Sequence, residues 1–127
     1  MEFKKLISSK ASRLLLIAFY FLAGLNHFIN PAFYTPLIPP YLGDEALINN
    51  LAGIAEIGLG LLVIPVKTRK WAVYGIMAML LAFLPSHLYF IEIGGCVQTG
   101  LCVPAWVAWV RLILVHPLLM LWAWKIK

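Results

Sequence analysis

Four long apolar runs constrain this chain more than any other feature of its sequence. They cover about residues 12–29, 46–65, 71–91 and 104–124. Each is close to the roughly 20 residues that an α-helix needs to cross a bilayer. Because hydrocarbon offers no water to bond with backbone polar groups, spans of this kind form helices. The sequence therefore predicts four transmembrane helices.

Composition excludes the main soluble alternatives. Hydrophobic residues make up 63% of the 127 residues and charged residues 12%, against about half and a quarter in an average soluble domain. A soluble domain of this length buries only roughly two-thirds of its unfolded surface, which is too little to hide so many apolar side chains. A disordered chain and a disulfide-stapled secreted scaffold are equally poor fits. We predict an all-α fold with one integral membrane domain over residues 1–127, an antiparallel four-helix bundle.

The basic residues predict how this bundle lies in the membrane. Nine of the ten Lys and Arg residues flank the apolar runs, at both chain ends and in the connection 67–70, whereas the connections 30–45 and 92–103 contain none. Basic flanks favour the cytoplasmic side. We therefore expect both termini in the cytoplasm and the protein in the cell (inner) membrane. The formal net charge of +5, placed in this way, indicates a lipid bilayer as the partner and not a nucleic acid.

Two segments need a separate interpretation. Residues 1–29 resemble a secretory signal peptide, because lysines precede an apolar stretch, but no A-x-A-like cleavage site follows, so we expect a retained helix. The connection 30–43 contains four prolines and is too apolar for a solvated linker. Since proline excludes regular structure, we expect this connection to lie at the interface or to fold over the outer mouth of the bundle.

Each predicted span also carries polar residues, which are costly in hydrocarbon. Such residues tend to face the bundle interior and are candidates for a functional site. In the second span, four polar or small residues recur at helical spacing and so share one face: Asn49, Gly53, Glu56 and Gly60. The other candidates are Asn26, His27, Ser86, His87, Arg111 and His116.

Helical rise predicts the depth of these residues. At 1.5 Å per residue, Glu56 lies about 14 Å and Arg111 about 10 Å below the outer surface, so an ion pair between them is feasible. His27 and His87 lie only about 4–6 Å deep. We therefore predict an outward-facing polar pocket with the two histidines at its rim and a Glu56–Arg111 pair at its floor.

We predict that ligand binding in this pocket involves Asn26, His27, Glu56, His87 and Arg111. The alternatives are an ion pair that only fixes helix register, and histidines that bond to water or lipid headgroups. No helix carries a metal-ligand spacing such as H-x-x-x-H, so we predict no metal site. His116 lies about 140° around the helix from Arg111, and its role stays open.

Two cysteines, Cys96 and Cys102, lie in a connection that we place on the oxidising side, where disulfides form. Closing so short a loop stabilises by about 2 kcal/mol in the chain-entropy model. A redox-active thiol pair is the alternative, but the C-x5-C spacing is not the C-x-x-C of thiol oxidoreductases. We favour a structural disulfide.

The sequence also resembles a known family, the DoxX-like membrane proteins. Residues 23–42, AGLNHFINPAFYTPLIPPYL, resemble its G-x-x-H-F-x-x-P signature and proline-rich loop. Residues 52–72 resemble its second helix with a central glutamate, and PSHLYF (85–90) and WVAWVR (106–111) complete the similarity. The resemblance implies a four-helix bundle in the inner membrane. It places at motif positions His27, Phe28, Pro31, Pro39, Pro40, Glu56 and Arg111.

The chain departs from this family pattern at three places. His87 stands where relatives often carry a small amide, His116 where a glutamine is frequent, and the loop with Cys96 and Cys102 is not a family hallmark. Named relatives take part in thiosulfate oxidation with quinone reduction or in membrane complexes that handle oxidative stress. The resemblance therefore implies a redox-associated role.

The first functional hypothesis is a redox-associated membrane protein that binds a small quinone-like or thiol/sulfur ligand in the outward pocket. Arg111 would hold an anionic or carbonyl oxygen, His27 would exchange protons, and Glu56 would position Arg111. No haem, flavin or iron–sulfur ligation pattern is present, so electrons would come from a redox partner protein or the substrate.

Two further hypotheses involve no chemistry. One is a non-enzymatic binding or transport module for a small lipid-like or anionic molecule, and the other is an assembly factor for a partner complex whose polar core only fixes geometry. The sequence is compatible with a homo-oligomer, and it leaves enzymatic and non-enzymatic functions both open.

Overall fold

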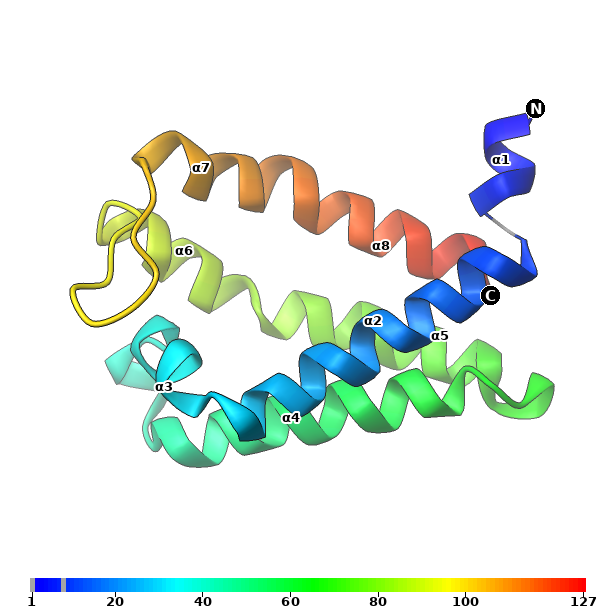
Figure 1. Ribbon diagram of the computed structural model, residues 1–127, viewed down its shortest axis with the longest axis horizontal. Helices are drawn as coiled ribbons and strands as arrows, with labels where there is room; N and C mark the ends of the chain where they lie inside the picture. The colour runs from blue at the N-terminus through cyan, green and yellow to red at the C-terminus, as the bar shows by residue number, and fades with distance from the viewer. Residues whose placement is uncertain (1, 8) are drawn as a thin grey trace.

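The computed structural model describes residues 2–7 and 9–127, and its regular structure there is helical throughout. Four helical segments are long and apolar enough to cross a membrane (Figure 1). They are Lys10–Ile29, Glu45–Leu62, Val66–Glu92 and Ala105–Lys125. This confirms the four predicted helical spans, with every boundary within five residues of its expected place.

The first two spans are single helices that begin at side-chain caps. Helix α2 (Lys10–Ile29) follows Ser9, whose hydroxyl oxygen accepts a hydrogen bond from the backbone N–H of Ser12. Helix α4 (Glu45–Leu62) follows Asp44, whose carboxylate accepts from the backbone N–H of Leu47. Such caps satisfy backbone donors that the first helical turn leaves unpaired.

The last two spans are interrupted near prolines. The third consists of α5 (Val66–Ala82) and α6 (Leu84–Glu92), with Pro85 in the first turn of α6. The fourth consists of α7 (Ala105–Val110), η3 (Arg111–Val115) and α8 (His116–Lys125), with Pro117 in the first turn of α8. Proline lacks a backbone N–H and its ring clashes with the preceding turn, which explains why both spans break there.

The segment η3 is a π-helical turn. The backbone N–H of His116 bonds to the carbonyl of Arg111, five residues earlier, whereas an α-helix bonds residues four apart. A π turn of this kind is rare and is found most often at functional sites. It changes the direction in which the side chains of the fourth span point.

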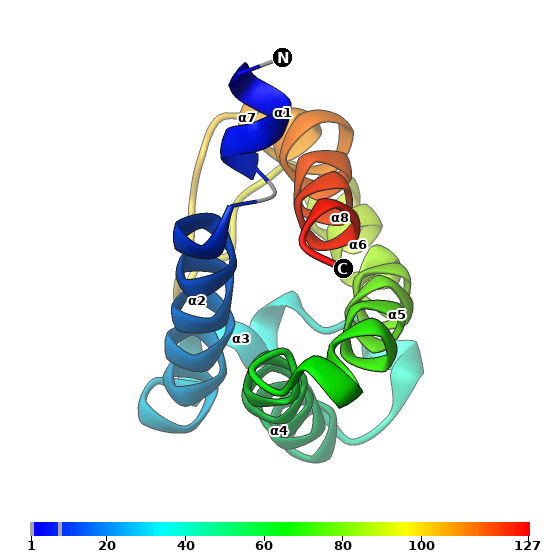
Figure 2. The same cartoon turned by 90° about the vertical axis from the view of Figure 1, so that its right-hand side faces the viewer.

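The spans form a ring in the order α2, α4, α5 and α8 (Figure 2). The closest pair is α2 and α4, where small residues meet: a Cβ added to Gly24 would lie 2.7 Å from the carbonyl oxygen of Gly53. The buried residues of α4 are the four whose spacing predicted a shared face, Asn49, Gly53, Glu56 and Gly60. Small residues on such a face let two membrane helices approach closely.

The ring closes between α8 and α2, where the indole Nε1–H of Trp122 donates to the hydroxyl of Ser12 at 2.8 Å. Both chain ends lie at this end of the molecule (Figure 1). Many large apolar side chains on all four spans are exposed, among them Leu22, Ile54, Leu81 and Ile113. An apolar outer surface of this kind is suited to contact with lipid.

The core divides into two clusters along the long axis. The larger lies toward the chain ends and contains Leu16, Tyr20, Val73 and Ile76 among its buried residues. The smaller lies toward the opposite end and contains Leu37, Phe90 and Ala108. The cavity described below takes lining residues from both clusters.

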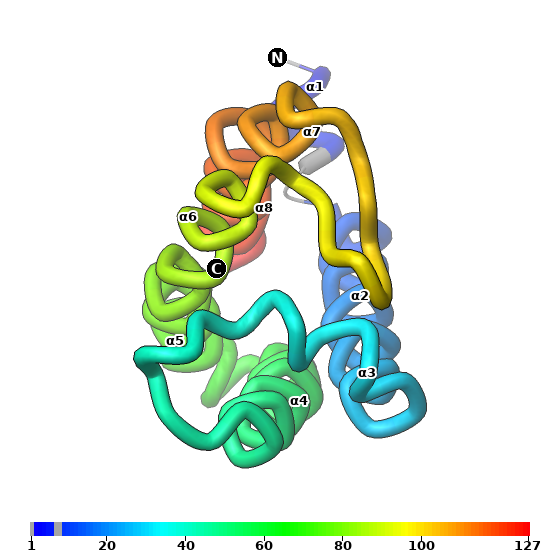
Figure 3. Tube along the Cα trace, turned by 90° about the vertical axis from the view of Figure 1, so that its left-hand side faces the viewer, coloured from blue at the N-terminus to red at the C-terminus, as the bar shows by residue number. Residues whose placement is uncertain are grey.

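The proline-rich connection crosses the end of the molecule opposite the termini (Figure 3). It contains the short helix α3 (Pro31–Tyr34) and the 3-10 turns η1 (Thr35–Leu37) and η2 (Pro40–Leu42). Two residues of this connection, Leu37 and Ile38, are buried. Of the two expected positions, the connection therefore takes the one over the mouth of the helices. A further short helix, α1 (Glu2–Ile7), precedes α2.

The second long connection holds a disulfide between Cys96 and Cys102. These cysteines also form an isolated antiparallel bridge. The turn before them uses Gly94 and Gly95 with φ of +79° and +78°, a conformation that glycine adopts without steric cost. The bond closes a seven-residue loop against the end of α6.

Replacing both cysteines with serine is expected to lower the free energy of unfolding by about 2 kcal/mol, because the unfolded chain regains the entropy of the open loop. The measurement is thermal unfolding in detergent with and without a reductant. Reductant should lower the Tm of the native protein toward that of the Cys96→Ser/Cys102→Ser variant and should leave the variant unchanged. An equal Tm for both proteins under oxidising conditions would contradict the stabilising role.

Candidate functional site

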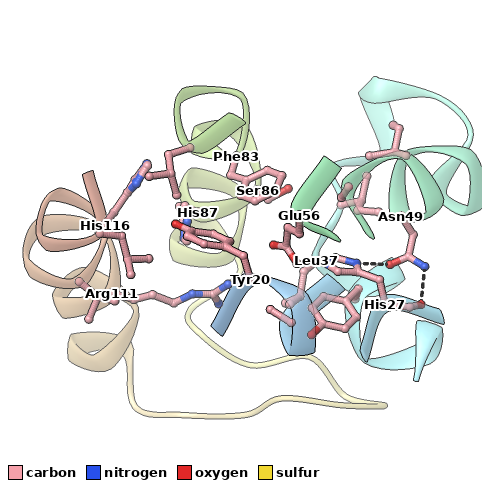
Figure 4. A pocket seen from close by; sticks show the side chains of 18 of the residues that line it. Tyr20, His27, Leu37, Asn49, Glu56, Phe83, Ser86, His87, Arg111 and His116 are labelled. Carbon is pink, nitrogen blue, oxygen red and sulfur yellow. Dashed lines mark hydrogen bonds and ion pairs between the residues drawn. The ribbon is translucent and has the colours of Figure 1, made fainter. Parts of the chain in front are cut away.

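A cavity of about 240 Å³ lies inside the ring of helices. Residues of all four spans line it, and Tyr34, Leu37 and Ile38 of the proline-rich connection cover it. Its volume is just below the roughly 300–1,000 Å³ of typical ligand pockets. Most of the lining is apolar. Polar side chains gather at two opposite ends, and Tyr20, Ser86 and Glu56 lie between them (Figure 4).

One polar end joins α2 to α4. The imidazole Nδ1 of His27 lies 2.7 Å from the side-chain oxygen of Asn49, and the side-chain nitrogen of Asn49 donates to the backbone carbonyl of His27 at 2.9 Å. The other imidazole nitrogen, Nε2, lies 3.5 Å from Oε2 of Glu56. All three residues are buried.

This geometry assigns protons to the His27 ring. The side-chain oxygen of Asn49 accepts hydrogen bonds and cannot donate them, so Nδ1 of His27 carries the hydrogen of this bond. Nε2 faces the carboxylate of Glu56 at 3.5 Å, and Oε2 of Glu56 has no hydrogen-bond partner. The carboxylate therefore lies beside the imidazole without a hydrogen bond between them.

Tyr34 and Asn26 support this end of the cavity. The ring of Tyr34, which lines the cavity, stacks on His27 with centroids 3.8 Å apart, and the side-chain amide of Asn26 donates to the Tyr34 hydroxyl at 2.7 Å. Asn26, one of the predicted ligand contacts, does not itself line the cavity, and its amide bonds to Tyr34.

The other polar end joins α6, η3 and α8. The guanidinium of Arg111 lies over the ring of Phe90, 5.2 Å from its centroid. The rings of His87 and His116 have centroids 5.0 Å apart. Figure 4 shows Arg111, His87 and His116 together on the side of the cavity opposite His27 and Asn49.

The predicted ion pair between Glu56 and Arg111 is wrong. Glu56 pairs with His27, and no carboxylate of the described residues lies within 4.0 Å of the guanidinium. The depth estimate fixes position along the membrane normal only, whereas α4 packs beside α2 and α5 and lies across the ring from the fourth span. The predicted pocket, with two histidines at its rim and an ion pair at its floor, is therefore also wrong. His27, with Glu56 beside it, lies at one end of the cavity, and His87 lies at the other end with Arg111.

The site has an unusual number of unsatisfied polar atoms. Among the described residues, six buried side-chain atoms have no hydrogen-bond partner, and all belong to residues that line this cavity. They are Tyr20 OH, Glu56 Oε2, His87 Nδ1, Arg111 Nη1 and His116 Nδ1 and Nε2. Buried polar groups are normally hydrogen-bonded, so six unpartnered atoms around one cavity set this part of the molecule apart from the rest of the described core.

Two lining residues with unpartnered polar atoms, Tyr20 and His116, were not among the predicted ligand contacts. Tyr20 is embedded in the aliphatic run of the first span, where no pattern marks it as functional. His116 joins Arg111 because the π turn bonds residues five apart and brings them toward one face. The other predicted contacts, His27, Glu56 and His87, line the cavity together with Arg111.

The described residues contain no group of three or more His, Cys, Asp or Glu side chains placed to hold a metal ion. The two cysteines are joined to each other and lie outside the cavity lining. The chemistry available at the site is therefore that of the guanidinium, the imidazoles, the carboxyl group and the tyrosine hydroxyl.

Comparison with known proteins places the chain in a family. Residues 16–127 match the model of a domain of unknown function, DUF8561. The chain belongs to the DUF8561 family. The matched range of this DUF8561 protein contains every residue that lines the cavity, from Phe19 to Leu119. Neither the curated proteins nor the solved structures give a match.

Proposed function

We propose that this DUF8561 protein is a redox-associated integral membrane protein that binds a small quinone-like or thiol/sulfur ligand in its cavity. The observation that carries the proposal is the set of six unpartnered polar atoms around one cavity. A flat ring with oxygen atoms on opposite sides fits a mostly apolar lining with polar groups at both ends. Polar groups inside membrane spans are retained at a cost, which favours function.

The His27–Glu56 pair is the proton-handling end of the site. Nε2 of His27 lies 3.5 Å from Oε2 of Glu56, and Oε2 has no hydrogen-bond partner. A ligand oxygen bound there would exchange protons with this pair. Glu56 positions His27, and not Arg111 as its depth predicts. Reduction of a bound quinone to a quinol takes two electrons, which a redox partner protein would supply, and two protons, which would pass from solvent through this pair one after the other.

We further propose that the helices form an antiparallel bundle in the cell (inner) membrane with both termini in the cytoplasm. Two observations support this orientation: the chain ends lie at one end of the molecule, and the basic start of α5 follows a short connection at that end (Figure 1). The DoxX-like signature around His27 and Pro31 supports the redox-associated role.

Filling the cavity tests the proposal. Ala23 lines the cavity, whereas Ala18, on the same helix α2, is exposed. Ubiquinone-1 or thiosulfate, added to purified protein in detergent, is expected to raise the Tm of the native protein and of Ala18→Phe by several degrees, because ligand binding stabilises the folded state. Ala23→Phe should show no rise, since its ring occupies the site.

The controls are the Tm values without probe and elution as a single species on size exclusion. A probe that raises the Tm of Ala23→Phe as much as that of Ala18→Phe binds elsewhere, and the cavity is then not the site. Absence of any rise with both probes in the native protein would contradict the assigned ligand classes.

A further inference from the structure

The guanidinium of Arg111 has no ion-pair partner among the residues that line the cavity. The carboxylate of Glu56, which also lines the cavity, lies 3.5 Å from Nε2 of His27. The remaining formal charge among the lining residues is the guanidinium of Arg111. A cation inside a membrane span is expensive unless it is paired or hydrogen-bonded. Among the described residues, no carboxylate supplies that pair.

The surroundings of Arg111 hold it in place without neutralising it. Phe90, 1% exposed, lies under the guanidinium. Nη1 of Arg111 is buried and has no hydrogen-bond partner. A stacked guanidinium with a free N–H edge is preorganised to bind the planar, two-oxygen edge of a carboxylate or a similar oxyanion.

Two imidazoles, with ring centroids 5.0 Å apart, line the same end of the cavity as Arg111 (Figure 4). His116 is 3% exposed, and neither of its ring nitrogens has a hydrogen-bond partner. His87 contributes a buried, unpartnered Nδ1 from the neighbouring helix α6. Each neutral imidazole offers one N–H donor. Three side chains from three helical elements thus place unpartnered nitrogen atoms at one end of the cavity (Figure 4).

We propose that Arg111, His87 and His116 bind the anionic oxygen group of the ligand, a carboxylate or an oxyanion of similar size. This inference rests on the proposed ligand-binding function. The first hypothesis allows Arg111 to hold either a carbonyl oxygen or an anionic oxygen of the ligand, and the inference chooses the anionic one. It also assigns a role to His116. The body of the ligand lies in the rest of the cavity, against apolar lining residues such as Phe83 and Leu80.

The anionic group could belong to a soluble molecule or to an amphiphile with a long chain. An apolar groove lined by Leu15, Leu118 and Trp122 lies between α2 and α8, next along both helices from cavity residues Phe19 and Leu119. The rings of Phe19 and Trp122 are 5.9 Å apart where the two spaces approach each other. Short- and long-chain probes therefore distinguish the two sources.

The experiment measures retention of radiolabelled octanoate and palmitate by the purified protein in detergent, with octanamide and palmitamide as neutral counterparts. Each acid is expected to bind at least about tenfold more tightly than its amide, because bonds to a charged group are the stronger ones. Arg111→Gln should weaken acid binding by about 10- to 100-fold. His116→Leu should weaken it by about fivefold, and Arg111→Lys should restore part of the affinity.

Arg13→Gln is the matched control, since Arg13 does not line the cavity, and it should bind both acids as the native protein does. A second readout is stability. Without a probe, Arg111→Gln should unfold at the same or a higher Tm, because it removes an unpaired buried cation. Addition of octanoate should raise the Tm only of those proteins that keep a cation at position 111.

Each outcome has a definite meaning. Preference for palmitate assigns the anionic group to a long-chain amphiphile, and equal binding of both acids assigns it to a soluble ligand. Amides that bind as tightly as the acids, or full acid binding by Arg111→Gln, would overturn the anion site. In that case ubiquinone-1 binding that Ala23→Phe abolishes leaves the proposed function in place. If neither acids nor ubiquinone-1 and thiosulfate bind, both proposals fail.

Discussion

Replacing His27 with leucine is expected to lower the free energy of unfolding by about 3–5 kcal/mol, as removal of one partner of a buried ion pair does. The substitution removes the ion pair with Glu56, the bond to Asn49 and the stacking on Tyr34. It leaves two buried polar groups without partners, and each of these costs free energy. The measurement is equilibrium unfolding in mixed micelles by titration with a denaturing detergent, followed by circular dichroism.

His116→Leu is the matched control for this prediction. His116 is as deeply buried as His27, but neither of its nitrogens has a hydrogen-bond partner. Its removal is expected to change the stability of the ligand-free protein by less than about 1 kcal/mol. A combined His27→Leu/Glu56→Leu variant should recover part of the loss, because no buried carboxylate is then left unpaired. Equal losses for the two single histidine variants would refute the structural importance of the pair.

Replacing Gly24 with alanine is expected to destabilise the protein by about 1–3 kcal/mol through overpacking. The added Cβ would lie 2.5 Å from Cγ1 of Ile57 and 2.7 Å from the carbonyl oxygen of Gly53. Because one of these contacts is backbone, the helices α2 and α4 must move apart. The same unfolding titration measures the loss, and the bond between His27 and Asn49 across this interface should loosen with it.

The control is Gly58→Ala on α4. A Cβ at Gly58 would meet no heavy atom within 4 Å. Alanine is favoured over glycine in a helix interior by up to about 1 kcal/mol, so this variant should be as stable as the native protein or more stable. Similar behaviour of Gly24→Ala and Gly58→Ala would show that the close approach of α2 and α4 does not limit stability.

Most of the fold could be predicted from the sequence because the physics of hydrocarbon leaves few choices. Apolar runs of bilayer length predict the spans, and 3.6-residue spacing predicts the buried face of α4 with Asn49 and Glu56. The prolines at positions 85 and 117 mark the interruptions in the third and fourth spans. Each of these signals is local, so it can be read without knowing how the helices pack.

The site could be predicted only in part, because it depends on packing across the ring. Residue depth brings Glu56 and Arg111 to similar levels, but it contains no information about which helices are neighbours. Glu56 therefore pairs with His27 on the adjacent α2 and not with Arg111. Asn26 carries the right chemistry next to His27, yet its amide is used to hold Tyr34.

The position of His116 could not be predicted for a different reason. Regular helix geometry places it about 140° from Arg111, whereas the π turn brings both to the same end of the cavity. Nothing in the residues RLILV distinguishes a π turn from an α-helix. The deviation from regular geometry is thus also the feature that completes the second polar end.

The π turn also makes this stretch tolerant of a change in length. Elsewhere in a membrane helix, a one-residue deletion rotates everything beyond it by roughly 100°. Within η3, losing an exposed residue such as Ile113 would leave the arginine and the histidine four apart, still on one face of an ordinary α-helix. Homologous chains one residue shorter here would keep both side chains in the cavity, so an alignment gap at this point is compatible with an unchanged site.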